Sequence, residues 1–177
     1  VIAIVAIVLI VSVSIYNSLI RSRNKAEEAE AAIDAHLTQR YDLIPNLVET
    51  VKGYAKHESS TLEKVIEARN QAVAAKGVAE KDKADNVVTQ SLRSLFALSE
   101  SYPELKANQN FIALQESLNN VERDLLDSRK YYNATARNFN DRIQTFPSNI
   151  IASAFHFKKL DYVKADDAAR TAPKVSF

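Results

Sequence analysis

Apolar side chains recur three and four residues apart from Phe111 to Phe139. Because an α-helix has 3.6 residues per turn, this spacing gathers the apolar side chains into one stripe and predicts a helix over residues 111–146. A stripe of about four heptads lets the helix pack along its length at the shallow crossing angle typical of coiled-coil-like packing. The stripe consists of Phe111, Leu114, Leu118, Val121, Leu125, Ser128, Tyr132, Thr135 and Phe139.

The rest of the chain is also poor in helix breakers, with two Gly and four Pro among 177 residues. Long uninterrupted segments favour helices over strands and turns. We therefore expect an all-α fold, a long antiparallel bundle of about four helices that continues from an N-terminal transmembrane helix. The other predicted helices cover residues 21–41, 45–75 and 84–101.

The connections between these helices follow from Pro, Gly and charged residues. Pro45 predicts a kink or a short break near residues 41–46. Gly77 is a helix stop and precedes a charged segment at residues 78–85, which we interpret as a loop. Pro103 ends the third helix, and residues 105–110 form a turn in which Asn108 or Asn110 caps the next helix.

Residues 1–15 are apolar except for two serines. This run is shorter than the roughly 20 residues that span a bilayer, but Leu19 and Ile20 prolong it, and we expect upstream residues to supply the remainder, since Val1 is not an initiator. Tyr16 suits the interface, and three basic residues follow within residues 21–25. We predict a transmembrane anchor over residues 1–20 with the domain on the cytoplasmic side; a cleaved signal peptide is the alternative.

The sequence offers no familiar catalytic or cofactor motif. The absence of Cys excludes thiolate nucleophiles and Cys-based metal sites, and two Gly are too few for a phosphate-binding loop. His57-Glu58 begins like a helical zinc motif, but Thr61 stands where the second His is needed. The net charge of +1 gives no electrostatic reason to expect nucleic acid as a partner.

Pairs of carboxylates lie on the predicted helices, among them Asp82 with Asp85 and Glu122 with Asp124. Acid–base chemistry would require a pocket that shifts one pKa, and these pairs stand among Lys, Arg and Ala, as on an exposed face. We interpret them as solvated surface, and Arg129 as a helix-pairing charge. We therefore assign no catalytic, cofactor-binding or metal residue, expect no cofactor, and predict that the protein is not an enzyme.

Two further segments each leave two interpretations. Residues 34–46 hold Asp34, Arg40, Tyr41, Asp42, Pro45 and Asn46. This group is a docking surface or a specified helix break, and we favour the break. Residues 150–157 are short and apolar and precede Lys158 and Lys159. They form a cap on one end of the bundle or an insert in the membrane surface, and we favour the cap.

Several motifs resemble the LemA family in collinear order. They include RYDLIPNLV at residues 40–48, VKGYA at 51–55, EARN at 67–70, YPELKAN at 102–108, YYN at 131–133, FPSN at 146–149 and APKVSF at 172–177. The resemblance implies a bacterial protein with an N-terminal membrane segment and a long helical domain, mostly of unknown biochemical function, with no catalytic motif to carry over. One departure is Glu30, in the region where a Trp is expected.

Together these features predict a bacterial inner-membrane, single-pass protein with an anchor at residues 1–20, a helical domain at 21–160 and a tail at 161–177. We expect a scaffold or interaction protein whose partners are the lipid bilayer, further copies of itself and other proteins. The alternatives are a membrane-remodelling protein, or an enzyme or ligand sensor with a site between helices. The last would need polar residues on a core stripe, where Ser128 and Thr135 are the candidates.

Overall fold

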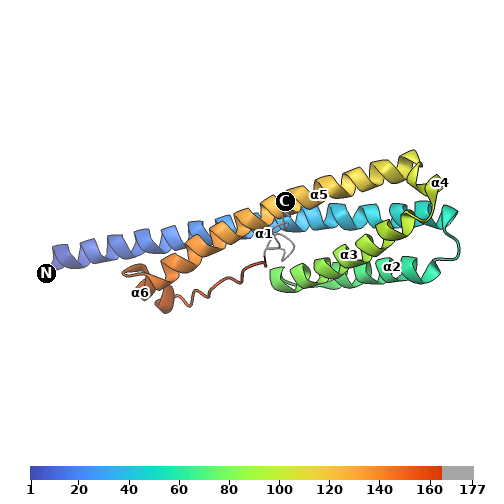
Figure 1. Ribbon diagram of the computed structural model, residues 1–177. Coiled ribbons are helices and arrows are strands. Elements are labelled where there is room, and N and C mark those ends of the chain that lie inside the picture. Colours follow the sequence, from blue (N-terminus) through green and yellow to red (C-terminus); the bar gives the residue numbers. More distant parts are fainter. Residues whose placement is uncertain (165–177) are drawn as a thin grey trace, which may run out of the picture.

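The computed structural model describes residues 1–164 (Figure 1). Within this range the chain is helical without a strand, so the all-α prediction is confirmed. Most of the predicted tail at 161–177, including the motif at 172–177, lies outside the described residues. The helices are α1 (Ile2–Tyr54), α2 (Ser59–Ala74), α3 (Val78–Ser99), α4 (Pro103–Lys106), α5 (Gln109–Gln144) and α6 (Ser148–Ala154).

The longest helices, α1 and α5, form an antiparallel pair (Figure 1). With 53 residues at 1.5 Å each, α1 is about 80 Å long. The predicted stripe of α5 is buried at six positions, whereas Leu114, Ser128 and Thr135 are half-buried. Those six are Phe111, Leu118, Val121, Leu125, Tyr132 and Phe139. Opposite them, α1 buries Ala29, Ile33, Leu37, Tyr41, Ile44, Leu47 and Val51, which also follow a spacing of three and four.

Helices α2 and α3 form a hairpin that packs beside the half of α1 farther from the N-terminus (Figure 1). Gly77 joins them with φ of 74°, a left-handed conformation that other residues adopt at a cost. Helix α4 then leads to α5, where the Asn108 side chain accepts a hydrogen bond from the Phe111 backbone N–H at 3.0 Å. One of the two predicted caps is therefore confirmed.

Three predicted boundaries are wrong. Helix α1 continues through Pro45 without a break, and the chain turns instead at residues 55–58, so the predicted helix at 45–75 is divided between α1 and α2. Gly53 therefore lies in the last turn of α1. The predicted loop at 78–85 is the start of α3, because Asp82 and Asp85 face inward and are buried. A helical segment whose inward-facing side chains are carboxylates lacks an apolar stripe, so a pattern that counts only apolar residues predicts a loop there.

The first part of α1 contacts little else in the protein. Residues 1–11 are exposed, and the first buried side chain is Leu19. By length and composition, this helix could cross a membrane. Because the helix is continuous to Tyr54, no loop separates its apolar part from the part that carries the core.

Helix α6 folds back against α1 and α5, as the cap interpretation predicts. The rings of Phe155 and Tyr16 lie 4.6 Å apart, and those of Phe157 and Phe139 lie 6.1 Å apart. His156, with φ of 57°, ends α6: the Phe157 N–H donates to the Ala152 carbonyl at 2.9 Å and the His156 N–H donates to the Ser153 carbonyl. These two bonds are a Schellman ending, which usually uses Gly at the left-handed position.

Candidate functional site

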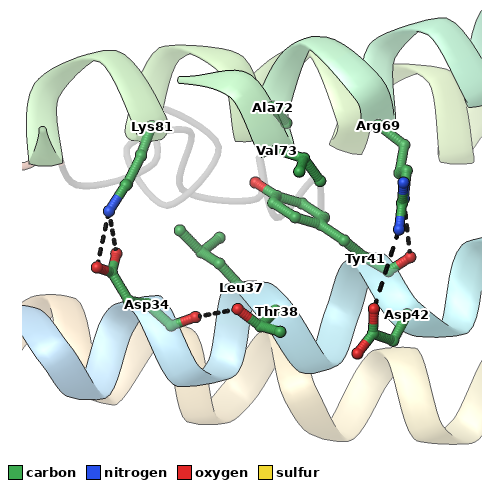
Figure 2. Close-up of a pocket in the computed structure, with 9 residues that line it drawn as sticks. All are labelled: Asp34, Leu37, Thr38, Tyr41, Asp42, Arg69, Ala72, Val73 and Lys81. Carbon is green, nitrogen blue, oxygen red and sulfur yellow. Dashed lines mark hydrogen bonds and ion pairs between the residues drawn. The ribbon is translucent and has the colours of Figure 1, made fainter. Parts of the chain in front are cut away.

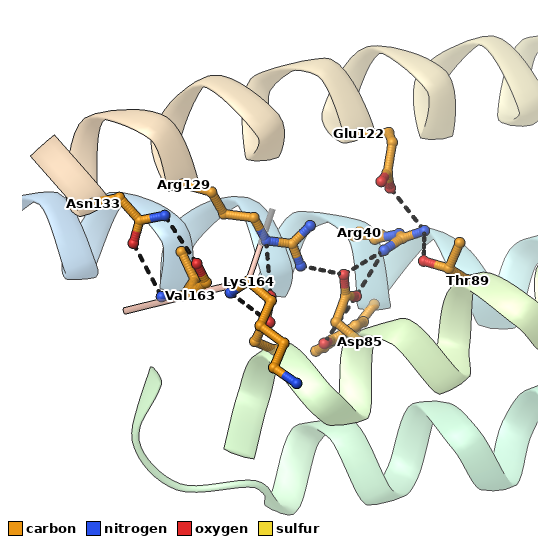
Figure 3. A network of polar contacts seen from close by, with 10 residues as sticks. Arg40, Asp85, Thr89, Glu122, Arg129, Asn133, Val163 and Lys164 are labelled. Atoms are coloured by element: carbon orange, nitrogen blue, oxygen red, sulfur yellow. Dashed lines mark hydrogen bonds and ion pairs between the residues drawn. The ribbon is translucent and has the colours of Figure 1, made fainter. Parts of the chain in front are cut away.

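A cluster of charged side chains occupies the junction of α1, α3 and α5 (Figure 3). Four of its members are buried: Arg40, Asp82, Asp85 and Arg129, each less than 10% exposed. Glu122 lies at the edge, with its side chain 36% exposed. Charged residues are rarely buried unless they are paired, so the partners within this cluster determine what it can do.

Asp85 of α3 lies at the centre and accepts hydrogen bonds from α1 and α5. Arg40 Nη1 of α1 lies 2.7 Å from both carboxylate oxygens, and Arg129 Nη2 of α5 lies 2.9 Å from Oδ2. The Tyr41 hydroxyl donates to Oδ1 at 3.2 Å. A carboxylate with two guanidinium partners and a phenol donor is fully engaged, which leaves it poorly suited to act as a base.

The two arginines also contact Asp82, Thr89 and Glu122. Arg129 Nε lies 3.2 Å from Asp82 Oδ1. Arg40 Nη2 donates to the Thr89 hydroxyl at 2.9 Å and lies 2.8 Å from Glu122 Oε2, an ion pair without hydrogen-bond geometry. The four buried charges therefore form a neutral group of two guanidiniums and two carboxylates, with Glu122 at its margin.

Tyr41 is held in its protonated form. Burial is the main cause that raises its pKa, and the neighbouring Asp85 charge raises it further. A phenolate here would face a carboxylate at hydrogen-bond distance, so the hydroxyl keeps its proton and acts as a donor. Its role in this geometry is to orient Asp85.

An extended strap, residues 158–164, is tied to α5 by two asparagines. Asn140 donates to the Leu160 carbonyl and accepts from the Leu160 N–H, both at 2.9 Å. Asn133 makes the same pair of bonds to Val163 at 2.9 and 3.0 Å. The Lys164 N–H then donates to Asp82 Oδ2 at 3.2 Å, so the strap reaches the charge cluster at Lys164 (Figure 3).

Tyr132 adds a third tie to the strap. Its hydroxyl donates to the Asp161 carbonyl at 2.8 Å. Burial is the main cause that raises the pKa of Tyr132 to about 12, and the charges of Glu30 and Asp161 add to it. The hydroxyl therefore stays protonated at neutral pH and keeps its donor.

Pro45 and Arg69 explain why α1 is not broken. Proline has no N–H, so the Tyr41 carbonyl, four residues earlier, loses its helical donor. Arg69 of α2 supplies a replacement, because its Nε donates to the Tyr41 carbonyl at 3.3 Å (Figure 2). The proline thus creates an attachment point for the hairpin rather than a break.

A pocket of about 270 Å³ opens beside this attachment, between α1, α2 and α3 (Figure 2). At one end Lys81 Nζ lies 2.7 Å from both oxygens of Asp34. At the other end Arg69 lies 3.9 Å from Asp42. Tyr41 and the apolar side chains of Leu37, Ala72 and Val73 line the space between them. The pocket is suited to a small polar molecule that would have to compete with these ion pairs.

The interpretation of the acidic pairs as solvated surface is wrong for Asp82, Asp85 and Glu122, since all three pair with buried guanidiniums. Arg129 does pair charges between helices, but in the interior. A sequence signal existed: Asp82 and Asp85 are in phase with Val88 and Leu92. A charged residue that continues an apolar stripe indicates a buried charge with a partner elsewhere.

The remaining candidates lie elsewhere. Of the group at residues 34–46, Arg40 and Tyr41 join the charge cluster, Asp34 and Asp42 line the pocket, and the predicted helix break does not exist. The Thr135 hydroxyl donates to carbonyls of its own helix, so it contributes no site. Within residues 1–164, no three His, Cys, Asp or Glu side chains gather in a way that could hold a metal ion.

Comparisons with known proteins give one matching family model and several relatives. The family model of the LemA family matches residues 29–177. Protein LemA of Metamycoplasma hominis is 24% identical over 159 residues, which are 87% of this chain and 71% of the relative. Magnetosome protein MamQ of Magnetospirillum gryphiswaldense is 21% identical over 88% of this chain and 67% of its own length. Magnetosome protein MamQ 2 of Paramagnetospirillum magneticum is 30% identical over 88 residues, 50% of this chain and 32% of the relative.

Proposed function

The chain belongs to the LemA family, and from this premise we propose that it is a membrane-anchored helical scaffold or interaction protein rather than an enzyme. The observation that carries the proposal is the continuity of α1 from Ile2 to Tyr54. Its exposed apolar start is the anchor, and its buried remainder is the stalk of the domain. The domain is cytoplasmic, because basic residues follow the anchor directly.

An uninterrupted helix fixes the distance between the bilayer and the hairpin. From Tyr16, at the proposed interface, to Tyr54 is 38 residues, or about 57 Å of helix. The charge cluster supports this arrangement, because Arg40, Asp85 and Arg129 connect the stalk to α3 and α5. The hairpin is thus presented to the cytoplasm at a defined height, as a scaffold requires.

The chemistry of the cluster favours a structural role over a catalytic one. Asp85 is occupied by three donors, and Arg40 and Arg129 are each paired with a carboxylate. A side chain that acts as a general base or nucleophile must be able to reach a substrate and to exchange a proton near neutral pH. The buried members of the cluster instead neutralise one another.

Self-assembly at the membrane is the finer form of the proposal. Copies tethered in one plane have a high effective concentration, so weak contacts between parallel domains become significant. Ile66 and Val73 of α2 are 42% and 55% exposed and seven residues apart, so they lie on one helical face, with Val73 at the open side of the pocket beside Tyr41. We propose this face as the contact between copies.

The absence of Cys makes the contact testable by single-cysteine crosslinking. The full chain with Val73→Cys, oxidised in proteoliposomes before extraction, should form a disulfide-linked dimer. The matched control is Lys130→Cys, an exposed position on α5 that should stay uncrosslinked. The mass of the detergent-extracted particle should exceed one 19.7 kDa chain. Single-chain particles together with no crosslink at Val73 would contradict self-assembly.

The pocket beside Tyr41 supports a second candidate, a sensor of a small polar ligand. Its volume and its mixed charged and apolar lining suit such a molecule. A ligand there would link α1 to the hairpin and stabilise the domain by mass action. A screen of small polar metabolites by thermal shift tests this, with Val73→Trp, which fills the pocket, as the control. A hit that stabilises both proteins equally would speak against the pocket.

A further inference from the structure

The end of α5, helix α6 and the start of the strap form a corner beside the apolar part of α1 (Figure 1). Arg142 Nη1 lies 2.5 Å from the Ser18 hydroxyl, and the Phe155 ring packs on Tyr16. These contacts place the corner, residues 142–160, at the level where α1 changes from exposed apolar residues to buried ones. A bilayer around the apolar start of α1 would have its surface at this level.

The corner buries Ala152 of α6 and exposes apolar side chains within the helix and just before and after it. Ala152 is 2% exposed, whereas Phe146, Ile150 and Phe155 are 80%, 59% and 58% exposed. Aromatic and aliphatic side chains gathered at a level where they meet lipid headgroups are typical of an interfacial segment. The cap and the membrane insert are therefore not exclusive, because different side chains of the same segment do each.

Charge is distributed unevenly in the same place. Residues 16–25 and 142–160 hold six basic side chains and no acidic one, whereas the remainder of the sequence holds 17 basic and 22 acidic side chains. The six are Arg21, Arg23, Lys25, Arg142, Lys158 and Lys159. A chain with a net charge of +1 thus concentrates its positive charge beside the proposed anchor, where the cytoplasmic leaflet is anionic.

A pocket of about 330 Å³ lies in the corner. The rings of Tyr16, Phe155 and Phe157 line one part of it, and Lys158, Lys159 and Arg23 line another. Arg23 is paired with Glu27 at 2.8 Å, whereas the lysines are exposed at the rim. Aromatic walls with ammonium groups at the rim fit a phosphate on a glycerol backbone, with the acyl chains passing over the apolar side chains.

We propose that this corner binds the anionic phospholipid surface of the membrane, with Phe146 and Ile150 inserted among the headgroups and Lys158 and Lys159 on the phosphates. The inference rests on the proposed anchor. The corner provides a second attachment besides α1, which holds α5 and the strap down on the membrane. The domain then meets the bilayer through two segments far apart in the sequence.

The test uses the full chain in vesicles with single cysteines carrying an environment-sensitive fluorophore. Ser153→Cys reports on the corner from an exposed position that leaves the apolar residues intact, Val8→Cys reports on the anchor, and Val73→Cys reports on the distant hairpin. Spin-labelled lipids quench fluorophores in or at the bilayer. Labels at positions 153 and 8 should be quenched and the label at 73 should not. Vesicles contain phosphatidylcholine alone or with phosphatidylglycerol.

Replacing the lysines tests the role of charge. Each basic residue near an anionic surface contributes about 1 kcal/mol, so Lys158→Gln with Lys159→Gln should lower the corner's binding equilibrium by up to about 30-fold. The loss of quenching at position 153 should occur only in vesicles with phosphatidylglycerol. The matched control, Lys64→Gln with Lys83→Gln on the hairpin, should change nothing, since both lysines are exposed away from the corner.

The outcomes separate this inference from the anchor itself. Quenching at position 8 with none at 153 would keep the anchor and overturn the corner. No quenching at position 8 would overturn the anchor and, with it, the inference. Quenching at 153 that is the same with and without phosphatidylglycerol, and is unchanged by the lysine replacements, would overturn the anionic-lipid assignment. Phe146→Ser with Ile150→Ser should also reduce quenching at 153 while far-UV circular dichroism stays unchanged.

Discussion

Asp85→Asn is the most informative single change to the charge cluster. The substitution keeps the shape of the side chain but removes the charge that faces two buried guanidiniums at 2.7 and 2.9 Å. Breaking a buried ion pair on one side costs about 3–5 kcal/mol, because a charge is left without its partner. That is a large part of a stability of about 5–15 kcal/mol.

The assay is chemical unfolding of the full chain in detergent micelles, followed by the loss of helical circular dichroism. With a urea m-value of about 1–3 kcal/mol/M, the expected loss lowers the midpoint by at least about 1 M. Glu122→Gln is the control, since its side chain is 36% exposed and has one cluster contact. It should cost about 1 kcal/mol or less.

A double substitution tests whether Arg40 and Asp85 neutralise each other. Arg40→Met alone should also be strongly destabilising, because it leaves Asp85 short of a charge partner. Arg40→Met with Asp85→Asn removes one cation and one anion and leaves the Arg129–Asp82 pair at 3.2 Å. The double change should therefore cost less than the two single changes together, by up to about 3 kcal/mol. Additive costs, or a cost of Asp85→Asn below about 1 kcal/mol, would refute the account of the cluster as mutually neutralising.

Three other expectations concern the backbone and pH. Gly53→Ala should stabilise the chain by about 0.5–1 kcal/mol, whereas Gly77→Ala should destabilise it by about 1 kcal/mol: neither added Cβ meets an atom within 4 Å, but φ at Gly77 is 74°. Arg69→Leu should lower the free energy of unfolding by about 1 kcal/mol, and by less in a Pro45→Ala background, where the backbone N–H of residue 45 again donates to the Tyr41 carbonyl. Equal losses in the two backgrounds would show that Arg69 does not compensate for the proline. Burial, with the neighbouring Asp34 charge, raises the pKa of Glu30, so its ionised form opposes folding; Glu30→Gln should stabilise the chain at pH 7, and unfolding midpoints measured down to about pH 4 should show this advantage disappear as the native carboxyl becomes protonated.

Periodicity was enough to predict α5 and its buried stripe, but not that its partner is a single helix, because Pro45 predicts a break inside α1. The stripe from Phe111 to Phe139 has one phase over its whole length, and six of its nine positions are buried and the other three half-buried. Apolar periodicity does not predict the buried charge cluster. Asp82 and Asp85 continue the stripe of α3, but a pattern that counts only apolar residues assigns them to a loop.

The buried charges escape prediction for a physical reason: a charge can be buried only beside a partner, and the sequence does not show which distant residue that partner is. Arg40 and Asp85 are 45 residues apart, and Arg129 is 44 residues beyond Asp85. Pro45 misleads for a similar reason, since the donor that replaces its missing N–H comes from Arg69 on another helix. Local sequence rules correctly give the free-energy cost of a buried charge or of a proline inside a helix. Contacts with other helices then compensate for that cost.

With the proposed anchor in the bilayer, the continuity of α1 makes the protein a lever whose fulcrum is the bilayer surface. Transmembrane helices tilt by about 20° on average, and the tilt changes when the hydrocarbon thickness differs from the length of the apolar segment. A straight arm of about 57 Å above the surface turns a 20° tilt into a lateral displacement of about 20 Å at Tyr54. A small change in membrane thickness is therefore amplified into a large change in where the hairpin reaches, without any rearrangement inside the domain.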